Sequence, residues 1–381
     1  MIRIFVLVAG MEYRINQLID HALAANRVTG TVVIVYRDGE PVFRRATGFA
    51  DREAGKPVGF DTIFRLASVT KPLVAATALA MVERGLLGLS DTAASHLPWF
   101  HPRLETGEVP DITVHHLLTH TSGLVYDPSL EQLPPDMAVS LGLSDTDLDF
   151  EANFSRLNAV PLPFRPGSQW AYGPSIDVLG AIIAKLHRGS LEEAVVHYVC
   201  NPLGLANTRF HVTDRERLAV PYADASPIPI RMPDPWASTD ADGWTIAFSP
   251  SRIFNPKAFQ SGGAGMAGTA DEIMTFLETL RLGGGGILKP ETVDMGFANQ
   301  IGAVNREEPG MKFGYFGAVV EDPAASGTPQ SRGTVCWGGV YGLNWFVDRQ
   351  NALSVLSVTN NALEGCMGEY PARITEAVYG A

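Results

Sequence analysis

The sequence is poor in cysteine, in positive charge and in long apolar runs. Its 381 residues include only three cysteines, Cys200, Cys336 and Cys366, which lie far apart and in no metal-ligand spacing. A disulfide framework is therefore not expected, and neither a metal nor another cofactor is predicted. Lys and Arg number 29 against 41 Asp and Glu, a net charge of −12. This balance argues against nucleic acid and anionic membranes as partners.

No apolar run approaches the length needed to span a bilayer. The first ten residues resemble a shortened signal peptide, but their apolar core is short, no Ala-x-Ala site follows, and the chain turns polar after Met11. We therefore expect a cytoplasmic protein that starts at Met1 or Met11. A periplasmic location stays open if this segment is a degenerate signal.

The order of strand and helix patterns predicts an α+β fold. An antiparallel sheet built from both termini is expected to be flanked by helices, with a largely helical insertion. The predicted domains are a sheet domain of residues 1–85 plus 265–381 and an inserted domain of residues 86–264, with the active site in the cleft between them. The expected strands are 31–36, 42–46, 334–337, 343–348 and 352–358, and the expected helices are 13–26, 70–82, 111–118, 177–186, 191–199 and 371–379.

A Ser-x-x-Lys sequence, from Ser68 to Lys71, begins an apolar run that extends to Val82. Residues three apart lie on the same helix face, so the Lys71 ammonium group is expected beside the Ser68 hydroxyl. A serine becomes a nucleophile when a neighbour takes its proton, and a desolvated lysine can do so. Taken alone, this motif also fits a helix cap followed by a solvated lysine.

Two further segments supply the other groups that acyl transfer needs. Tyr172 precedes a helix that we expect to start near Ser175, and a tyrosine beside a lysine ammonium can act as a general base or acid. Gly338 and Gly339 lie in a late strand, where glycines mark the close approach of a ligand or another backbone. A strand edge of this kind can offer a backbone N–H to a developing oxyanion.

These three motifs, in this order, resemble the serine β-lactamase and penicillin-binding-protein superfamily. The class C branch also carries a His-Thr-Ser-Gly-Leu stretch like residues 120–124. Within that branch the chain is similar to the family VIII carboxylesterases, particularly the cephalosporin-deacetylating type, from about residue 14 onward. The resemblance implies a fold with Ser68 as the nucleophile, Lys71 and Tyr172 as a coupled base and acid, and the backbone N–H groups of Ser68 and Val340 as the oxyanion hole.

Two positions depart from the β-lactamase pattern. Pro174 replaces the asparagine of Tyr-x-Asn, and Trp337 replaces the lysine of Lys-Thr-Gly. Loss of that cation weakens binding of anionic substrates, while an indole offers an apolar wall for a neutral ester. We therefore predict a serine carboxylesterase for short- to medium-chain acyl esters, with Trp337, Gly338, Gly339 and Tyr126 binding the substrate. Residues 236–244 are a further candidate wall.

Two other segments match the motifs of different hydrolase classes only in part. Gly142 to Thr146 approaches the Gly-x-Ser-x-Gly motif of a Ser-His-Asp hydrolase but fails at its last residue. His116 and His120 have zinc-protease spacing, yet Leu117 stands where the catalytic glutamate belongs, so these histidines are predicted to be structural. Within the superfamily, a β-lactamase, a D-amino-acid peptidase or amidase, an acyltransferase and a non-enzymatic penicillin-binding relative remain alternatives.

Overall fold

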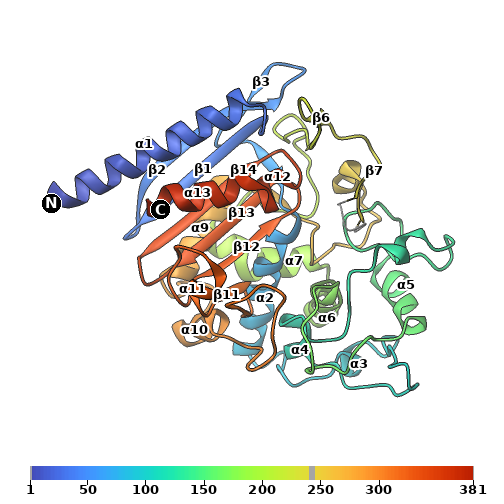
Figure 1. Ribbon diagram of the computed structural model, residues 1–381. Helices are drawn as coiled ribbons and strands as arrows, with labels where there is room; N and C mark the ends of the chain where they lie inside the picture. Colours follow the sequence, from blue (N-terminus) through green and yellow to red (C-terminus); the bar gives the residue numbers. More distant parts are fainter. Residues whose placement is uncertain (1, 240–244, 381) are drawn as a thin grey trace.

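The computed structural model describes residues 2–239 and 245–380, with side chains described from residue 10 onward. Its largest element is an eight-stranded sheet to which both ends of the chain contribute, seen as the blue and red arrows of Figure 1. In spatial order the strands are β10 (Met311–Phe313), β11 (Ala318–Val320), β12 (Val335–Gly339), β13 (Leu343–Asp348), β14 (Leu353–Thr359), β1 (Gly30–Arg37), β2 (Glu40–Asp51) and β3 (Lys56–Pro57).

The pairing of β1 joins the two ends of the chain. β1 pairs antiparallel with β14 on one side and with β2 on the other. Asp38 and Gly39 form the predicted hairpin turn, and both have positive φ angles, as a tight two-residue turn requires. The predicted antiparallel sheet of an α+β fold is therefore confirmed.

Helices cover both faces of this sheet (Figure 1). α1 (Ile2–Ala24) and α13 (Glu369–Tyr379) pack on one face, in a core that includes Val33 and Val35 of β1. Val32 and Ile34 belong to the core on the other face, because successive side chains of a strand point to opposite faces. α9 (Ala270–Arg281) packs against β1, β13 and β14 on that face. The remaining helices near the sheet are α10 (Pro290–Phe297), α11 (Pro323–Ser326) and α12 (Glu364–Met367).

α2 (Thr70–Glu83) is the central helix, and its residues from Thr70 to Met81 are all buried. A helix that is apolar all round needs neighbours on every side, and α2 packs against α6 (Ser175–His187) and α7 (Leu191–Val195) from the middle of the chain. The nucleophile candidate Ser68, two residues before this helix, is thereby attached to a buried element of the core.

Residues 86–264 contain short helices and small two-stranded sheets, drawn in colours from teal through green to yellow in Figure 1. The helices other than α6 and α7 are α3 (Ala93–His96), α4 (Val114–Leu118), η2 (Pro128–Gln132), α5 (Phe150–Phe154), η3 (Ser155–Ala159), η4 (Val196–Cys200), α8 (Asn201–Leu203) and η5 (Pro250–Phe254). The strands are β5 (Tyr222–Ala223), β6 (Ile230–Arg231), β7 (Trp236–Thr239) and β8 (Thr245–Phe248). The division into two domains stays a prediction.

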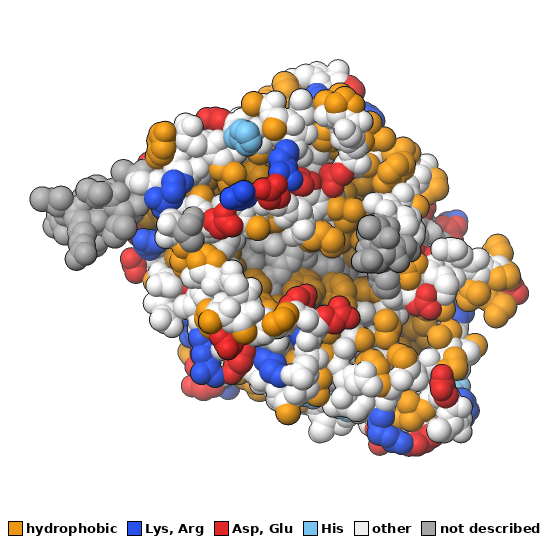
Figure 2. Space-filling view, in the orientation of Figure 1, with side chains coloured by type: hydrophobic (Ala, Val, Ile, Leu, Met, Phe, Trp, Pro, Cys, Tyr) orange, Lys and Arg blue, Asp and Glu red, His pale blue; other side chains and the backbone are white. Residues whose placement is uncertain are grey.

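The first helix is longer than predicted. The expectation was a helix over residues 13–26, whereas α1 extends from Ile2 to Ala24. Among the described residues no helix combines the length and apolarity needed to cross a membrane. On the face shown in Figure 2, Lys and Arg side chains lie next to Asp and Glu side chains, and the surface is hollowed near its centre.

Candidate active site

Ser68 is held between a short strand and the central helix. β4 (Ile63–Arg65) pairs with β9 (Ala267–Thr269), the chain then forms the 3₁₀ turn η1 (Ala67–Val69), and α2 follows directly. Ala67 has a φ of +44°, a region that side chains with a Cβ rarely occupy. Such strain persists where the surrounding structure imposes it, often at functional sites. Here it precedes the candidate nucleophile.

The three predicted catalytic side chains come together. The Tyr172 hydroxyl donates to Ser68 Oγ at 2.8 Å, and Lys71 Nζ donates to the same oxygen at 3.2 Å. Lys71 Nζ also lies 4.6 Å from the centre of the Tyr172 ring. A serine hydroxyl in contact with both a phenol and an amine has two routes for its proton. This arrangement fits nucleophilic catalysis by Ser68.

Lys71 is oriented by a main-chain group and by a buried carboxylate behind it. Lys71 Nζ donates to the carbonyl oxygen of Gly263 at 2.8 Å and to the Tyr126 hydroxyl at 3.4 Å. The N–H of Gly263 in turn donates to Asp177 Oδ1 at 3.1 Å, and Ser261 Oγ donates to the same atom at 2.5 Å. A Cβ on Gly263 would lie 2.5 Å from Asp177 Oδ2, so this approach requires glycine.

Asp177 was missed as a site residue by the sequence interpretation. It is fully buried, and burial raises its carboxyl pKa, while the Lys71 charge and the bonds from Ser261 and Gly263 act in the opposite direction. The signal was present: Asp177 is the one acidic residue in the apolar helix α6, five positions after Tyr172. A buried carboxylate requires partners, but the sequence did not indicate which ones.

Aromatic rings surround Tyr172. The His120, Trp337 and Trp170 rings lie 4.9, 5.2 and 6.4 Å from the Tyr172 ring, centre to centre. Trp337 Nε1 also donates to the Tyr172 hydroxyl at 3.3 Å. Burial, with Lys71 and Arg306 nearby, holds the pKa of the His120 imidazole well below its usual range. His120 is therefore a neutral packing partner of Tyr172 rather than a charged one.

Arg306 supports this aromatic group and was also missed from sequence. Its side chain is 3% exposed, and its guanidinium carbon lies 4.5 Å from the Trp170 ring and 5.4 Å from the Trp337 ring. Such cation–π contacts are stronger when they are desolvated. A positive charge therefore remains in this region although Trp337 replaces a lysine, but it lies against the indole ring and pairs with Glu308.

The glycines of β12 allow the sheet to touch the turn that carries Ser68. A Cβ on Gly339 would lie 2.2 Å from the carbonyl oxygen of Leu66, and a Cβ on Gly338 would lie 2.8 Å from Cys366 Sγ. The sequence predicted a close approach at these glycines, and at Gly339 the approaching group is another backbone. The oxyanion hole formed by the N–H groups of Ser68 and Val340 stays a prediction.

The remaining predicted residues have these positions. Tyr126 contacts Lys71, and burial raises the pKa of its phenol well above the usual range, with a further contribution from Asp177. His116 Nδ1 accepts from the Thr113 N–H at 3.2 Å at the start of α4, a structural contact. Of the proposed wall at 236–244, Trp236 lies in β7, whereas residues 240–244 fall outside the described residues.

Comparisons with known proteins agree with this geometry. The beta-lactamase family profile matches residues 15–378. The chain is 45% identical to Esterase EstB of Burkholderia gladioli over 97% of this chain and 96% of that protein. It is 40% identical in sequence to the solved structure of EstCE1, described as a hydrolase with promiscuous acyltransferase activity, with a TM-score of 0.93 over 98% of this chain and all of that chain.

A more distant structure shares the fold alone. Unliganded simvastatin synthase (LovD) from Aspergillus terreus superposes with a TM-score of 0.73 at 23% identity, over 96% of this chain and 97% of that chain. The resemblance to the family VIII carboxylesterases that the motifs indicated is confirmed by the two nearer relatives. The chain belongs to the beta-lactamase family.

Proposed function

We propose that this protein is a serine carboxylesterase that hydrolyses short- to medium-chain acyl esters through an acyl-enzyme on Ser68. One observation carries the proposal: Ser68 Oγ contacts both the Tyr172 hydroxyl and Lys71 Nζ, at 2.8 and 3.2 Å. The 45% identity to Esterase EstB over nearly the whole chain supports an ester as the substrate.

In the proposed reaction, Ser68 Oγ attacks the ester carbonyl while the pair of Lys71 and Tyr172 takes its proton. The tetrahedral intermediate collapses, the alcohol leaves with that proton, and the acyl group stays on Ser68. Water then attacks the acyl-enzyme and gives a proton to the same pair. The bond between Ser68 Oγ and the acyl carbon breaks, the pair returns the proton to Ser68 Oγ, and the carboxylic acid is released. Strongly coupled groups titrate as a pair, so the base is assigned to Lys71 and Tyr172 together.

The recognition groups favour a neutral ester over a β-lactam. Pro174 has no side-chain amide to hold an acylamino group, and Trp337 has no charge to attract a substrate carboxylate. Trp337 instead donates from its indole to Tyr172 and presents a flat apolar ring. We propose that these two residues, with Gly338, Gly339 and Tyr126, form the part of the site that contacts the ester.

A mainly apolar pocket of about 360 Å³ supports the preference for an acyl chain. Tyr126 and Pro174 lie in its wall, so it adjoins the catalytic centre. The rest of the wall is formed by four leucines, two valines, two further prolines, a glycine and an aspartate: Leu124, Leu130, Leu157, Leu162, Val125, Val160, Pro161, Pro163, Gly123 and Asp127. Apolar burial contributes roughly 0.8 kcal/mol per CH₂ group, so each added carbon that fits is expected to increase kcat/KM until the pocket is full.

The test is a set of parallel initial rates on p-nitrophenyl acetate, p-nitrophenyl caprylate, nitrocefin and a D-alanyl amide. We expect fast cleavage of the two p-nitrophenyl esters and slow or no reaction of the other substrates. Fast opening of the nitrocefin ring with little ester cleavage would contradict the esterase proposal and indicate a β-lactamase. No reaction with any of the four would favour a binding protein.

Acyl transfer to an alcohol is the second candidate function. The structurally similar EstCE1 is described as a hydrolase with promiscuous acyltransferase activity, and an acyl-enzyme can be attacked by an alcohol as well as by water. Adding a primary alcohol to the p-nitrophenyl ester assay and quantifying the new ester against the free acid measures the partition. Free acid as the main product at low alcohol concentration supports the esterase.

A further inference from the structure

Val340 lies in the four-residue turn between β12 and β13. The Gly342 N–H donates to the carbonyl oxygen of Gly339 at 2.8 Å, which makes Val340 and Tyr341 the central residues of a β-turn. A peptide unit is planar, so the bond to the Gly339 oxygen also fixes the direction of the Val340 N–H. The hydrogen bonds of the described residues include none that this N–H donates. It can therefore bond to a ligand.

The second peptide of this turn is held by a distant segment of the chain. The Leu363 N–H donates to the Val340 carbonyl oxygen at 3.1 Å. In a β-turn the central peptide can adopt two opposite orientations, which distinguish the type I form from the type II form. A donor on the central carbonyl selects one of them, so Leu363 fixes the peptide that follows the Val340 N–H.

Leu363 has an unusual backbone conformation. Its φ and ψ angles are +63° and −58°, and the Glu364 N–H donates to the Ala362 carbonyl oxygen at 2.8 Å. These features define a γ-turn of the rare, strained kind. A residue with a side chain keeps such a conformation only where its surroundings impose it, and such residues cluster at functional sites. The strain therefore indicates a role for this turn beyond connecting β14 to α12.

The contacts that impose this conformation come from the middle of the chain. The Ala362 N–H donates to the Tyr222 carbonyl oxygen at 2.8 Å, and Asp224 Oδ2 accepts from the Glu364 N–H at 2.8 Å. The residues on either side of Leu363 are thus both bound to the segment that begins with β5. Loss of hydration raises the pKa of Asp224 to about 6, so at about pH 8 its carboxylate is charged and makes a charge-assisted bond.

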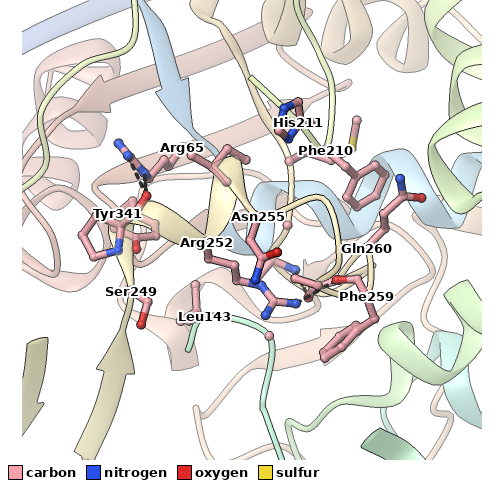
Figure 3. Close-up of a pocket in the computed structure, with 18 of the residues that line it drawn as sticks. Arg65, Leu143, Phe210, His211, Ser249, Arg252, Asn255, Phe259, Gln260 and Tyr341 are labelled. Carbon is pink, nitrogen blue, oxygen red and sulfur yellow. Dashed lines mark hydrogen bonds between the residues drawn. The ribbon is translucent and has the colours of Figure 1, made fainter. Parts of the chain in front are cut away.

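The other side of the β-turn is fixed by packing. Tyr341 is 6% exposed, and its ring lies 5.2 Å from the Phe248 ring, centre to centre. The guanidinium carbon of Arg65 lies 5.9 Å from the centre of the Tyr341 ring. Figure 3 shows Tyr341 beside Arg65 at the wall of a small cavity. Arg65 precedes Ser68 by three residues, so this packing joins the turn to the segment that carries the nucleophile.

We propose that Leu363 is a positioning residue that, held by Asp224, keeps the Val340 N–H directed at the oxyanion of the tetrahedral intermediate. This inference rests on the proposed esterase function and on the oxyanion hole predicted for Ser68 and Val340. An N–H that is fixed before the reaction stabilises developing charge without reorganisation. Because this stabilisation acts in the transition state, its loss lowers kcat and leaves KM unchanged.

The direct test replaces one main-chain N–H by an ester oxygen. Leu363→leucic acid, introduced during translation, keeps the leucine side chain but cannot donate to the Val340 carbonyl. The matched control is Leu86→leucic acid, which removes the bond from the Leu86 N–H to the Met81 carbonyl at 3.0 Å. Leu86 lies just beyond the end of α2 that is opposite Ser68.

Both analogues are expected to lose similar stability in urea denaturation, because each lacks one main-chain hydrogen bond. With p-nitrophenyl acetate at about pH 8, the Leu363 analogue should have a kcat about tenfold lower at unchanged KM, and the Leu86 analogue a kcat within about twofold of the wild type. The affinity of the Leu363 analogue for a trifluoromethyl ketone, which forms a tetrahedral adduct with a serine, should also fall about tenfold. Equal kcat in the two analogues would overturn this inference alone, whereas a wild type that hydrolyses no ester would overturn the proposed function with it.

Asp224 provides a second test, which decides the question if the Leu363 analogue does not fold. Asp224→Ala removes one acceptor of the Glu364 N–H and should lower kcat about threefold, less than the analogue, because the Ala362 carbonyl still accepts. Asp224→Asn keeps an oxygen acceptor and should restore most of the activity. The control is Asp271→Ala, at an exposed pair with Arg44, which should keep the wild-type kcat. Wild-type kcat in Asp224→Ala, or an equal loss in Asp224→Asn, would contradict the inference.

Discussion

Lys71 and Trp337 both contact Tyr172, but they are held by different kinds of neighbours. Lys71 is 5% exposed, and its amine donates a hydrogen bond to the carbonyl oxygen of Gly263. The N–H of Gly263 in turn donates to Asp177. Trp337 is partly exposed and is held by ring contacts, with the Arg306 guanidinium against its indole. The first set is directional and fixed by hydrogen bonds, whereas the second depends on shape and on apolar contact.

This difference suggests a division of work within one small site. Hydrogen bonds of fixed geometry suit proton transfer, which requires donor and acceptor at bonding distance. Ring contacts tolerate exchange of one apolar side chain for another of similar size. The comparison therefore predicts that changes beside Lys71 reduce turnover strongly, while changes beside Trp337 alter it moderately.

The largest effect is expected at Ser68, because its Oγ accepts hydrogen bonds from both Lys71 and Tyr172. Ser68→Ala removes the nucleophile and should reduce kcat for p-nitrophenyl acetate by about 10⁴-fold or more. Lys71→Ala and Tyr172→Phe should each abolish most turnover too, and combining them should add little, because the groups act as a unit. Ser95→Ala, an exposed serine on α3, is the control. Near-normal rates in Ser68→Ala would refute the proposed mechanism.

Gly263→Ala tests whether the main-chain anchor of Lys71 matters. The added Cβ would lie 2.5 Å from Asp177 Oδ2 and 3.1 Å from the Tyr126 hydroxyl, so the loop must shift. Misplacement of a catalytic group by about 1 Å costs on the order of 100-fold in rate, and we expect a loss of kcat of that size. At Gly285 a Cβ would meet no atom within 4 Å, so Gly285→Ala should keep full activity. Equal rates in the two variants would contradict the role of the anchor.

Asp177→Asn separates activity from stability. Burial raises the pKa of Asp177 in the folded protein, so its contribution to stability is present at low pH and is lost as the pH rises through the folded value. Asp177→Asn lacks this loss, so the free energy of unfolding of the variant, compared with that of the wild type, should rise as the pH is raised above about 4, the ordinary pKa of an aspartate.

The same variant removes the negative charge behind Gly263 and should lower kcat about tenfold. Urea denaturation at several pH values and ester hydrolysis measure the two effects. Asp294→Asn, at an exposed pair with Arg349, should change neither. If the free energy of unfolding of Asp177→Asn instead decreases relative to that of the wild type as the pH rises, the pKa of Asp177 is not raised in the folded protein.

The smallest effect is expected at Trp337. Trp337→Phe keeps an aromatic ring next to Arg306 and Phe313 but removes the indole N–H that donates to Tyr172 at 3.3 Å. Loss of one such bond corresponds to about twofold to tenfold in kcat. Trp99→Phe, a tryptophan packed against Phe100, is the control. If Trp337→Phe lowers kcat as much as Lys71→Ala does, the proposed difference between the Lys71 and Trp337 contacts is wrong.

Local sequence patterns predicted the parts of the molecule that local physics determines. Two features depend only on neighbours along the chain. One is the hairpin at Asp38 and Gly39, where the two-residue turn determines the pairing of the strands. The other is the spacing of Ser68 and Lys71, which places both on one helix face. The position of Tyr172 was predicted through resemblance, because nothing local joins it to a serine 104 residues away.

The parts that were missed depend on contacts between distant segments. The link from Asp177 through Gly263 to Lys71 joins three segments, with separations of 86 and 192 residues. Arg306 lies in a loop with no strand or helix pattern, so the sequence did not indicate which rings it contacts. A buried charge can be suspected from an apolar context, but its partner is known only when the chain is folded.

The carbonyl of Gly263 that orients Lys71 has a consequence for inheritance. Every amino acid has a main-chain carbonyl, so no substitution at position 263 removes this oxygen. A bulkier residue there can only displace it. Neither Trp337 nor Pro174 contributes to this bond, so we expect their exchange to leave the orientation of Lys71 unchanged. The residues that we propose to contact the ester can therefore vary while the main-chain contact that orients the lysine is kept.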